Sequence, residues 1–491
     1  MKRGFYTILA AQFFSALADN ALLFAAIALL KQVHAPSWHT PILQQSFILS
    51  FIFLAPFVGA FADSLPKGRV MFISNGIKMA GCLAMLVGIN PLVAYGLAGF
   101  GAAAYSPAKY GILTEFLPHE KLVWANSWME GLTVAAIIMG AVVGGLLITP
   151  SISASILQSM HIPAMVTPPE LAIFIIFFIY LIAALFNLYI PLVPIEHKPL
   201  NRNPVFLIKD FVHCFVLLWK DPLGQVSLAV TTLFWGAGAT LRLLVLAWAA
   251  VALNYNIGEA AKLTAWVAVG IAIGSILAAR FIKLEHAVNV IPVGIGMGLM
   301  VLAMIPVSHP LLAILLLITI GVMGGFFVVP MNALLQHRGH LLMGAGRSIA
   351  VQNFNENISI FLMLGLYELM VKLDLNINII ILVFGLLMAG IMSLLYKKHG
   401  HDQDNGRIKP RAGVVMQIRK IMSTKNRYTI SIAATLCSLL LCACSPSNDQ
   451  TPAPKLFKEQ RDVLDKAKAV DEEQHKHNDD QQKALEKQTE Y

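Results

Sequence analysis

The sequence predicts an all-α membrane protein whose twelve spanning helices form two six-helix halves. Of its 491 residues, 57% are hydrophobic and only 13% are charged, whereas soluble domains carry about a quarter charged residues. The hydrophobic residues gather in runs long enough to cross a bilayer, which takes about 20 apolar residues. A polar, proline-bearing run occurs once in each half, a pattern typical of transporters built from two related repeats.

Each spanning helix is predicted from one apolar run, and each connection from the polar or turn-forming residues between two runs. The predicted spans, in order, are residues 5–30, 42–62, 70–89, 92–117, 123–148, 170–191, 224–253, 261–282, 288–306, 310–335, 347–371 and 377–396. The predicted divisions of the chain are an N-terminal six-helix bundle (1–191), a cytoplasmic linker (192–223), a C-terminal six-helix bundle (224–398), a polar linker (399–421) and a lipoprotein-like signal segment with a polar tail (422–491).

The basic residues alternate between the connections, and this alternation predicts the orientation. One side of the membrane carries only Lys31, Lys262 and Lys372, and the other carries most of the remaining Lys and Arg residues of the connections. Because Lys and Arg are enriched in cytoplasmic loops, we expect both ends of the twelve-helix unit to be cytoplasmic in a bacterial inner membrane. The net charge of +9 therefore indicates membrane lipids as partners and not nucleic acid.

A polar segment lies at residues 101–111, inside the apolar run 92–117. It contains a lysine, two tyrosines and Pro107, and lipid offers such groups no partners, so they must face a protein interior or a water-filled cavity. The second half has a counterpart at residues 324–332: superposing Pro107 on Pro330 places Lys109 on Asn332. The duplication predicts two repeats with related helices.

The connection between the second and third runs carries a glycine, an acid and then basic residues, at Gly59, Asp63, Lys67 and Arg69. This arrangement resembles the cytoplasmic signature loop of the major facilitator superfamily, which braces neighbouring helices on the inner side. Pro66 interrupts the pattern. The alternative is an ordinary basic cytoplasmic loop.

Five motifs in order along residues 4–396 together resemble the bacterial lysophospholipid transporter family. They are Ala18-Asp19-Asn20-Ala-Leu-Leu-Phe, Ala104-Tyr-Ser-Pro-Ala-Lys-Tyr-Gly-Ile-Leu113, Phe234-Trp-Gly-Ala-Gly, Gly321-Val-Met-Gly-Gly-Phe-Phe-Val-Val-Pro330 and Ala350-Val-Gln-Asn353. The resemblance implies a major facilitator bundle that moves lysophospholipids, chiefly lysophosphatidylethanolamine, to the cytoplasmic side by alternating access. It also implies a cytoplasmic acyltransferase/acyl-carrier-protein synthetase as partner, and no cofactor. The alternative function is export of amphipathic drugs or metabolites on the same fold.

Two charges of opposite sign occupy matching depths on repeat-related helices. Asp19 lies near the middle of the first run and Arg242 in the seventh, and a carboxylate at the membrane centre costs about 2.5–3.5 kcal/mol on insertion scales. We expect an ion pair between Asp19 and Arg242 across the halves, made in one access state and broken in another. The alternative is that each is satisfied within its own half, Asp19 by Asn20 or a neighbouring hydroxyl.

A second set of polar residues suits a phosphoethanolamine headgroup. Carboxylates with amides can hold the ammonium, and a lysine or arginine the phosphate, through charge-assisted hydrogen bonds. For Lys78 we favour extension to the interface over ligand binding; for Lys109 the two remain open, and the acids alternatively brace helix packing. The candidate substrate-binding or gating residues are Asp19, Asn20, Tyr105, Lys109, Tyr110, Asn126, Glu130, Arg242, Asn353 and Glu356.

An enzymatic function is not expected. Two His-x4-Asp matches, His399 to Asp404 and His475 to Asp480, lie in polar segments without the apolar frame of an acyltransferase site. No Gly-x4-Gly-Lys-Ser/Thr phosphate loop is present, so direct use of ATP is not expected. No histidine spacing indicates a metal site.

The tail has a different character from the spanning region. A basic start at residues 422–427 precedes a short apolar run at 428–441 and then Cys442-Ala443-Cys444. This resembles a bacterial lipoprotein signal peptide with Cys444 as the lipidated residue. A separate lipoprotein joined to the transporter explains the pattern. The alternative is a thirteenth span, which would be short for a bilayer.

Overall fold

A computed structural model describes residues 2–404 except 36–38, 160–166, 194–199, 202 and 256. The α-helices in the described part are α1 (Lys2–Gln32), α2 (His39–Ser64), α3 (Lys67–Leu86), α4 (Pro91–Phe116), α5 (Leu122–Leu147), α6 (Pro150–Ser159), α7 (Pro168–Leu188), α8 (Pro204–Lys220), α9 (Pro222–Ala252), α10 (Ile257–Phe281), α11 (Ile291–Leu302), α12 (Pro310–Met343), α13 (Ala345–Lys372) and α14 (Ile377–Asp404). Two 3-10 helices, η1 (His119–Lys121) and η2 (Leu284–Val290), precede α5 and α11.

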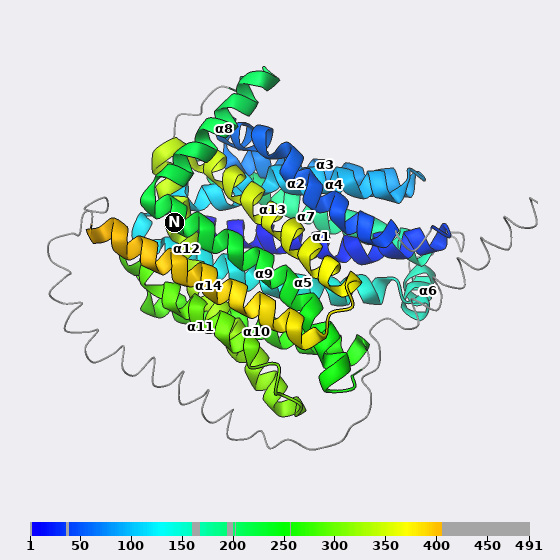
Figure 1. The fold of residues 1–491 in the computed structure, drawn as a ribbon. Helices are drawn as coiled ribbons and strands as arrows, with labels where there is room; N and C mark the ends of the chain where they lie inside the picture. The colour runs from blue at the N-terminus through cyan, green and yellow to red at the C-terminus, as the bar shows by residue number, and fades with distance from the viewer. Residues whose placement is uncertain are drawn as a thin grey trace, which may run out of the picture.

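The predicted fold class is confirmed. Helices α1–α5 and α7 form the first half, and α9–α14 form the second half (Figure 1). Each predicted span corresponds to one of these helices, although η2 forms the start of the ninth span. The structure adds α6 and α8, which the sequence analysis left as connections. The exact limits of the two halves and of the linker at 192–223 stay predictions.

Ten helices in the described part are long and apolar enough to cross a membrane. Helices α4 and α13 are not among these ten. Both pack inside the bundle: α4 contacts α2, α3 and α13, and α13 also contacts α9. Buried protein partners can satisfy polar side chains that lipid cannot, and these two helices hold half of the ten candidate residues.

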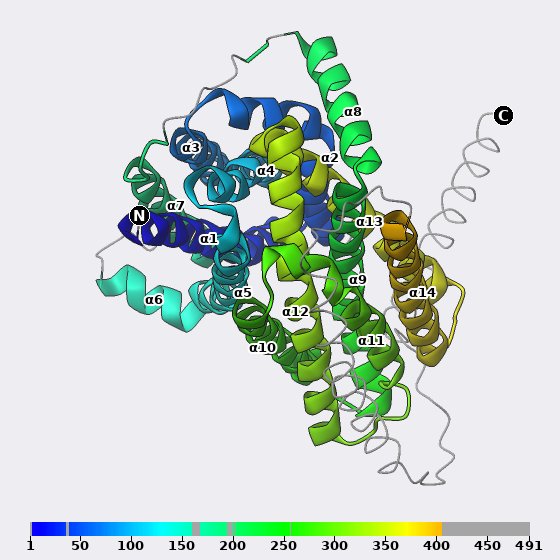
Figure 2. The same ribbon diagram turned by 90° about the vertical axis from the view of Figure 1, so that its left-hand side faces the viewer.

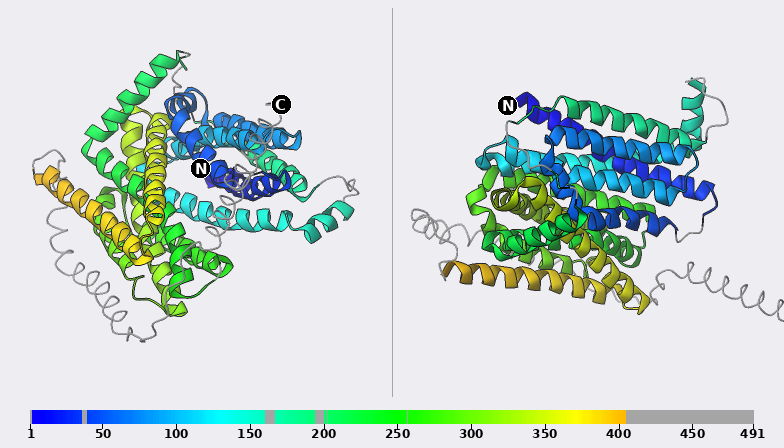
Figure 3. Two further views of the ribbon diagram at one scale, coloured as in Figure 1. Left: turned by 45° about the vertical axis from the view of Figure 1, so that its right-hand side comes forward. Right: turned by 90° about the horizontal axis from the view of Figure 1, so that it is seen from above.

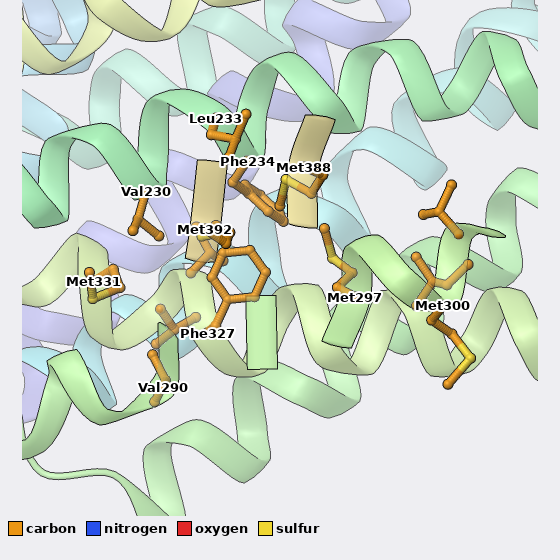
Figure 4. Close-up of a cluster of buried hydrophobic side chains, with 14 of the residues drawn as sticks. Val230, Leu233, Phe234, Val290, Met297, Met300, Phe327, Met331, Met388 and Met392 are labelled. Carbon is orange, nitrogen blue, oxygen red and sulfur yellow. The ribbon is translucent and has the colours of Figure 1, made fainter. Parts of the chain in front are cut away.

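The second half has an apolar core in which side chains from α9, α11, α12 and α14 interlock (Figure 4). Phe234 of α9 meets Phe327 of α12 edge-on, with ring centroids 5.5 Å apart. Gly324 lies beside Phe234, so that a Cβ at Gly324 would stand 3.1 Å from the ring. The glycine of the duplicated segment therefore makes room for a large aromatic side chain.

Helices α10 and α12 approach at backbone distance. A Cβ at Gly274 would lie 2.0 Å from the Val322 carbonyl oxygen, and a Cβ at Gly325 would lie 2.2 Å from the Ile271 oxygen. Small residues four apart permit such close packing between membrane helices. The two helices therefore pack at close range within the second half.

The two halves meet at one end and diverge toward the other (Figure 1; Figure 3, left). The meeting end carries the connection between α2 and α3, η1 and the start of α13, and α8 lies there as well (Figure 2). We call it the closed end. The short helix α6 lies at the opposite end (Figure 1).

Candidate functional site

The signature-loop aspartate binds the N-terminus of a helix from the other half. Asp63, in the last turn of α2, accepts hydrogen bonds from the backbone N–H of Gly346 at 2.7 Å and of Arg347 at 3.1 Å. These amides belong to the first turn of α13, where N–H groups lack helical partners and the helix dipole favours negative charge. Gly344 precedes them with φ +105, a conformation suited to glycine. Asp63 therefore caps α13 across the halves.

Side-chain charges surround this cap. The Arg347 guanidinium reaches Asp63 at 3.3 Å and Asp210 of α8 at 2.7 Å. Lys67 pairs with Asp63 at 2.9 Å and with Glu115 of α4 at 3.1 Å. The cap thus joins α2, α3, α4, α8 and α13 at the closed end.

Of the four residues of the predicted signature loop, three meet at this cap. Besides Asp63 and Lys67, Gly59 lies where α2 approaches α13: a Cβ there would stand 2.9 Å from the Arg347 Cα. Arg69 is exposed and does not take part in the described cap. The loop therefore braces helices of opposite halves.

An amide pair forms a second contact between the halves. Asn126 of α5 donates to Gln336 of α12 at 2.8 Å, and Gln336 donates back to Asn126 at 2.8 Å. The two residues are 0% and 1% exposed. We call this pair the amide clasp. Next to it, Ser127 donates to the Ser275 carbonyl of α10 at 2.6 Å.

A chain of polar side chains forms a third contact. Glu130 of α5 accepts from Tyr110 of α4 at 3.2 Å and from Asn332 of α12 at 3.3 Å. Gln352 of α13 donates to Asn332 at 3.0 Å and to Glu356 at 2.7 Å. We call these five residues the Glu130 chain. It brings Tyr110, Glu130 and Glu356 together, as the sequence suggested, and it runs between the halves.

Lys109 and Asn353 lie on the helices that flank this chain. Lys109 is buried, with its ammonium 4.2 Å from the centroid of the Tyr110 ring. No carboxylate of the described residues lies within 4.0 Å of its Nζ. Asn353 of α13 donates to Ser106 of α4 at 2.8 Å, another contact across the halves.

In this structure Asp19 is satisfied within its own half, and the expected bridge to Arg242 is not made. Its carboxylate pairs with Lys78 of α3 at 2.8 Å and accepts from Tyr180 of α7 at 2.8 Å. Arg242 is exposed, and among the described residues its side chain has no hydrogen bond or ion pair. The sequence analysis matched helix depth between the repeats and set aside the cation on the neighbouring helix α3, so a bridge to Arg242 in another access state stays a prediction.

Lys78 does not extend to the interface, so that prediction was wrong. The residue is 0% exposed, and its ammonium lies between the rings of Tyr105 and Tyr180, 4.7 Å and 5.5 Å from their centroids. A Cβ at Gly101 would stand 2.7 Å from Lys78 Cγ. The glycine of the first duplicated segment therefore makes room for Lys78, so that aliphatic carbons pack on α4 while the charge meets Asp19.

The remaining candidates have local roles. Asn20 donates to the Ala16 carbonyl of its own helix at 2.8 Å. The Tyr105 ring packs under the Lys78 ammonium, and its hydroxyl, buried in this structure, has no described hydrogen-bond partner. Cys444 lies outside the described residues, so its lipidation stays a prediction.

Several residues of these contacts were missed. Tyr180 carries a hydroxyl group within a mainly apolar run, and this could have marked it as a hydrogen-bond partner for a buried polar residue. Gln336 falls just beyond the predicted end of the tenth span, because α12 continues to Met343. Asp210 belongs to α8, which was not expected as a helix.

The arrangement is suited to reversible contact between the two halves. Its members are amides, carboxylates, hydroxyls, ammonium groups and a guanidinium, joined by hydrogen bonds and ion pairs. No cluster of three or more metal-ligating side chains occurs in the part of the chain that the structure describes. Breaking the cap, the clasp and the Glu130 chain would free the halves to move at the closed end.

Comparison with known proteins identifies relatives of this chain. The family model described as Major Facilitator Superfamily matches residues 8–364. The chain is 48% identical over 373 residues to the "Lysophospholipid transporter LplT" of Serratia proteamaculans, which covers 76% of this chain and 89% of that protein. It is 46% identical over 375 residues to the protein of the same name from Yersinia enterocolitica, covering 76% and 88%.

Solved structures share the fold at low sequence identity. A bacterial homologue of the iron transporter ferroportin in an outward-facing state superposes with a TM-score of 0.61 at 15% identity, covering 81% of this chain and 99% of that one. The transporter FucP in the outward conformation gives 0.60 at 14% identity, covering 81% and 98%. At such identity the likeness concerns the fold alone.

Proposed function

Since the chain belongs to the major facilitator superfamily and, within it, to the family of lysophospholipid transporters, we propose that it moves lysophospholipids across the bacterial inner membrane. The observation that carries the proposal is the 46–48% identity to proteins of that name over 88–89% of their length. Lysophosphatidylethanolamine is the proposed main substrate, delivered to the cytoplasmic side for reacylation by an acyltransferase/acyl-carrier-protein synthetase. The proposed role is transport and not catalysis.

The proposed orientation places the closed end, and with it the N-terminus, in the cytoplasm. Basic residues concentrate there: Lys67, Arg338 and Arg347 all lie at the closed end. The positive-inside rule supports this orientation. The structure then corresponds to a state closed toward the cytoplasm, in which a lysolipid would enter from the periplasmic side.

Alternating access would follow from rocking of one half against the other. Opening toward the cytoplasm requires the Asp63 cap, the amide clasp and the Glu130 chain to break, because each joins residues of opposite halves. The same step would expose Glu130 and Glu356. These carboxylates would then be available for the ammonium of the ethanolamine headgroup, with Lys109 available for its phosphate.

Uptake of radiolabelled lysophosphatidylethanolamine tests the proposal. Spheroplasts of a host without its own lysolipid transporter should accumulate label only when they express this chain. Unlabelled lysolipids should compete, whereas diacyl phospholipids should compete poorly. Absence of uptake together with export of an amphipathic dye would favour the alternative exporter, and acyl transfer by the purified protein would reveal an enzyme.

Glu130→Gln separates substrate recognition from gating. If Glu130 holds the ammonium, the variant should lose more uptake of lysophosphatidylethanolamine than of lysophosphatidylglycerol, which has no ammonium. Lys109→Ala should reduce both, because both carry phosphate. Equal loss of the two lipids in Glu130→Gln would assign this carboxylate to the contact between the halves.

A further inference from the structure

Helix α8 presents two separate apolar faces, and only one of them is used inside the protein. Leu207, Cys214 and Leu218 are buried against the closed end, 7%, 3% and 0% exposed. Their spacing of seven and four residues places them on one side of the helix. This face packs with side chains of α9, α12 and α13.

The second apolar face is exposed. Val205, Ile208, Val212 and Val216 are spaced by three, four and four residues, which aligns them along the helix. Their exposures are 58%, 46%, 53% and 40%. Isolated exposed apolar residues are normal, but an aligned stripe marks an interaction surface.

Basic residues border this stripe. Lys209, His213 and Lys220 are exposed and follow the apolar stripe around the helix on the side away from the bundle. The only acid of α8, Asp210, faces the other way, because it binds Arg347 at 2.7 Å. Apolar and basic sectors side by side are typical of helices that lie in the interface of an anionic membrane.

Aromatic contacts fix which way the stripe faces. Phe211 and Phe215 meet the ring of Phe354 in α13, with centroids 5.3 Å and 6.1 Å apart. Phe354 lies more than two turns inside α13, counted from the closed end. The side of α8 that bears the two phenylalanines therefore faces along the spanning helices, toward the hydrocarbon region. The exposed stripe continues from this side around the helix.

We propose that α8 is a membrane-surface helix that docks on the leaflet at the closed end. Its stripe centred on Val212 sits at the boundary of headgroups and acyl chains, and Lys209 and Lys220 reach lipid phosphates. Figures 1 and 2 show α8 at that end, outside the array of spanning helices. The stripe continues from the aromatic side of α8 that faces along the spanning helices, and the lysines complement anionic lipid. A protein partner or a second copy would not require that combination. The proposal is independent of the transported substrate.

The test measures the depth of α8 in the intact protein. A small fluorescent residue is introduced by codon suppression at position 212 or, as the matched control, at 213, in the full chain reconstituted in nanodiscs of phosphatidylethanolamine and phosphatidylglycerol. Lipids brominated along the acyl chain should quench the fluorophore at 212, consistent with a depth of about 5–10 Å. The fluorophore at 213 should respond mainly to iodide in the water.

Each other outcome overturns the proposal. Stronger iodide quenching at 212 than at 213 would place the stripe in the cytoplasm. Protection of 212 from both quenchers would mean that protein covers it, either a partner or a second copy.

A second arm tests the charge. Replacing Lys209 and Lys220 with Gln should weaken the bromolipid quenching at 212 in phosphatidylglycerol-containing discs and leave it unchanged in phosphatidylcholine discs. Each lysine contributes roughly fivefold to binding at an anionic surface. Identical quenching by the two proteins in both kinds of disc would show that anionic lipid is not the partner.

Discussion

The amide clasp should hold the closed end shut, and its removal should shift the balance between access states. Asn126 and Gln336 exchange two hydrogen bonds of 2.8 Å between the halves. Hydrogen bonds between membrane helices contribute about 0.6 kcal/mol on average and about 1.7 kcal/mol at most. The clasp therefore contributes roughly 1–3 kcal/mol. A free energy of that size changes the ratio of closed to open protein about 5- to 150-fold.

The assay is a distance measurement across the closed end. Spin labels attached to unnatural residues at exposed positions 121 and 341, on η1 and on the last turns of α12, should report a short distance in the closed state. In Asn126→Ala and in Gln336→Ala the long-distance population should grow. The double variant should show no further growth, because either substitution alone already breaks both bonds. Asn355→Ala is the matched control, since within the described part of the chain the Asn355 side chain bonds only to the Val351 carbonyl of its own helix.

Additivity would refute the reasoning. If the free-energy change of the double variant equals the sum of the two single free-energy changes, the coupling energy is zero and the residues do not act on each other. A shift in the Asn355→Ala control equal to that of the clasp variants would show a general loss of packing.

Lys78→Ala should lower the free energy of unfolding in detergent by about 3–5 kcal/mol, because it leaves the partly buried Asp19 uncompensated. Replacing both residues with neutral residues of similar shape should recover most of the loss. No recovery would argue against the ion pair. Gly274→Ala should lower the free energy of unfolding by about 1–3 kcal/mol in the same assay, because the added methyl group overpacks the contact between α10 and α12. Gly238→Ala, with nothing within 4 Å of its Cβ, should be neutral. Equal effects of the two substitutions would contradict the close approach of α10 and α12. Truncation after residue 404 should leave lysolipid uptake intact, and lost membrane insertion would make the tail part of the fold.

The sequence predicted the helices well because bilayer thickness fixes their length. Apolar runs of the required size mark nearly every span, and the duplicated prolines lie inside α4 and α12 as expected. Helix α8 was missed because its apolar residues form two narrow faces and not a continuous run. Its Asn203 cap and Pro204 start are signals that a search for amphipathic helices would have used.

The sequence singled out residues of the candidate site, but it did not predict which residues they contact. The sequence singled out Glu130, Asn126 and Glu356 because polar residues in apolar runs need partners. It did not supply the partners, since those lie on helices far apart along the chain. Depth along a helix can be counted from its ends, but the face that each residue presents depends on the rotation of the helix. For this reason Asp19 was assigned to Arg242 and not to Lys78.

The distribution of strong and weak contacts is consistent with a protein that must open and close. Breaking a buried ion pair costs about 3–5 kcal/mol, and the Asp19–Lys78 pair lies wholly within the first half, so rocking of the halves leaves it intact. Across the halves the deeply buried contacts are hydrogen bonds of amides and hydroxyls, together with one hydrogen bond from the Asn332 amide to Glu130. Each of them costs less to break than a buried ion pair. The charged cross-half contact, Asp63 with Arg347, lies at the closed end, where water can replace the lost partners. A strong ion pair therefore stabilises the first half, and weaker contacts between the halves set the balance between access states.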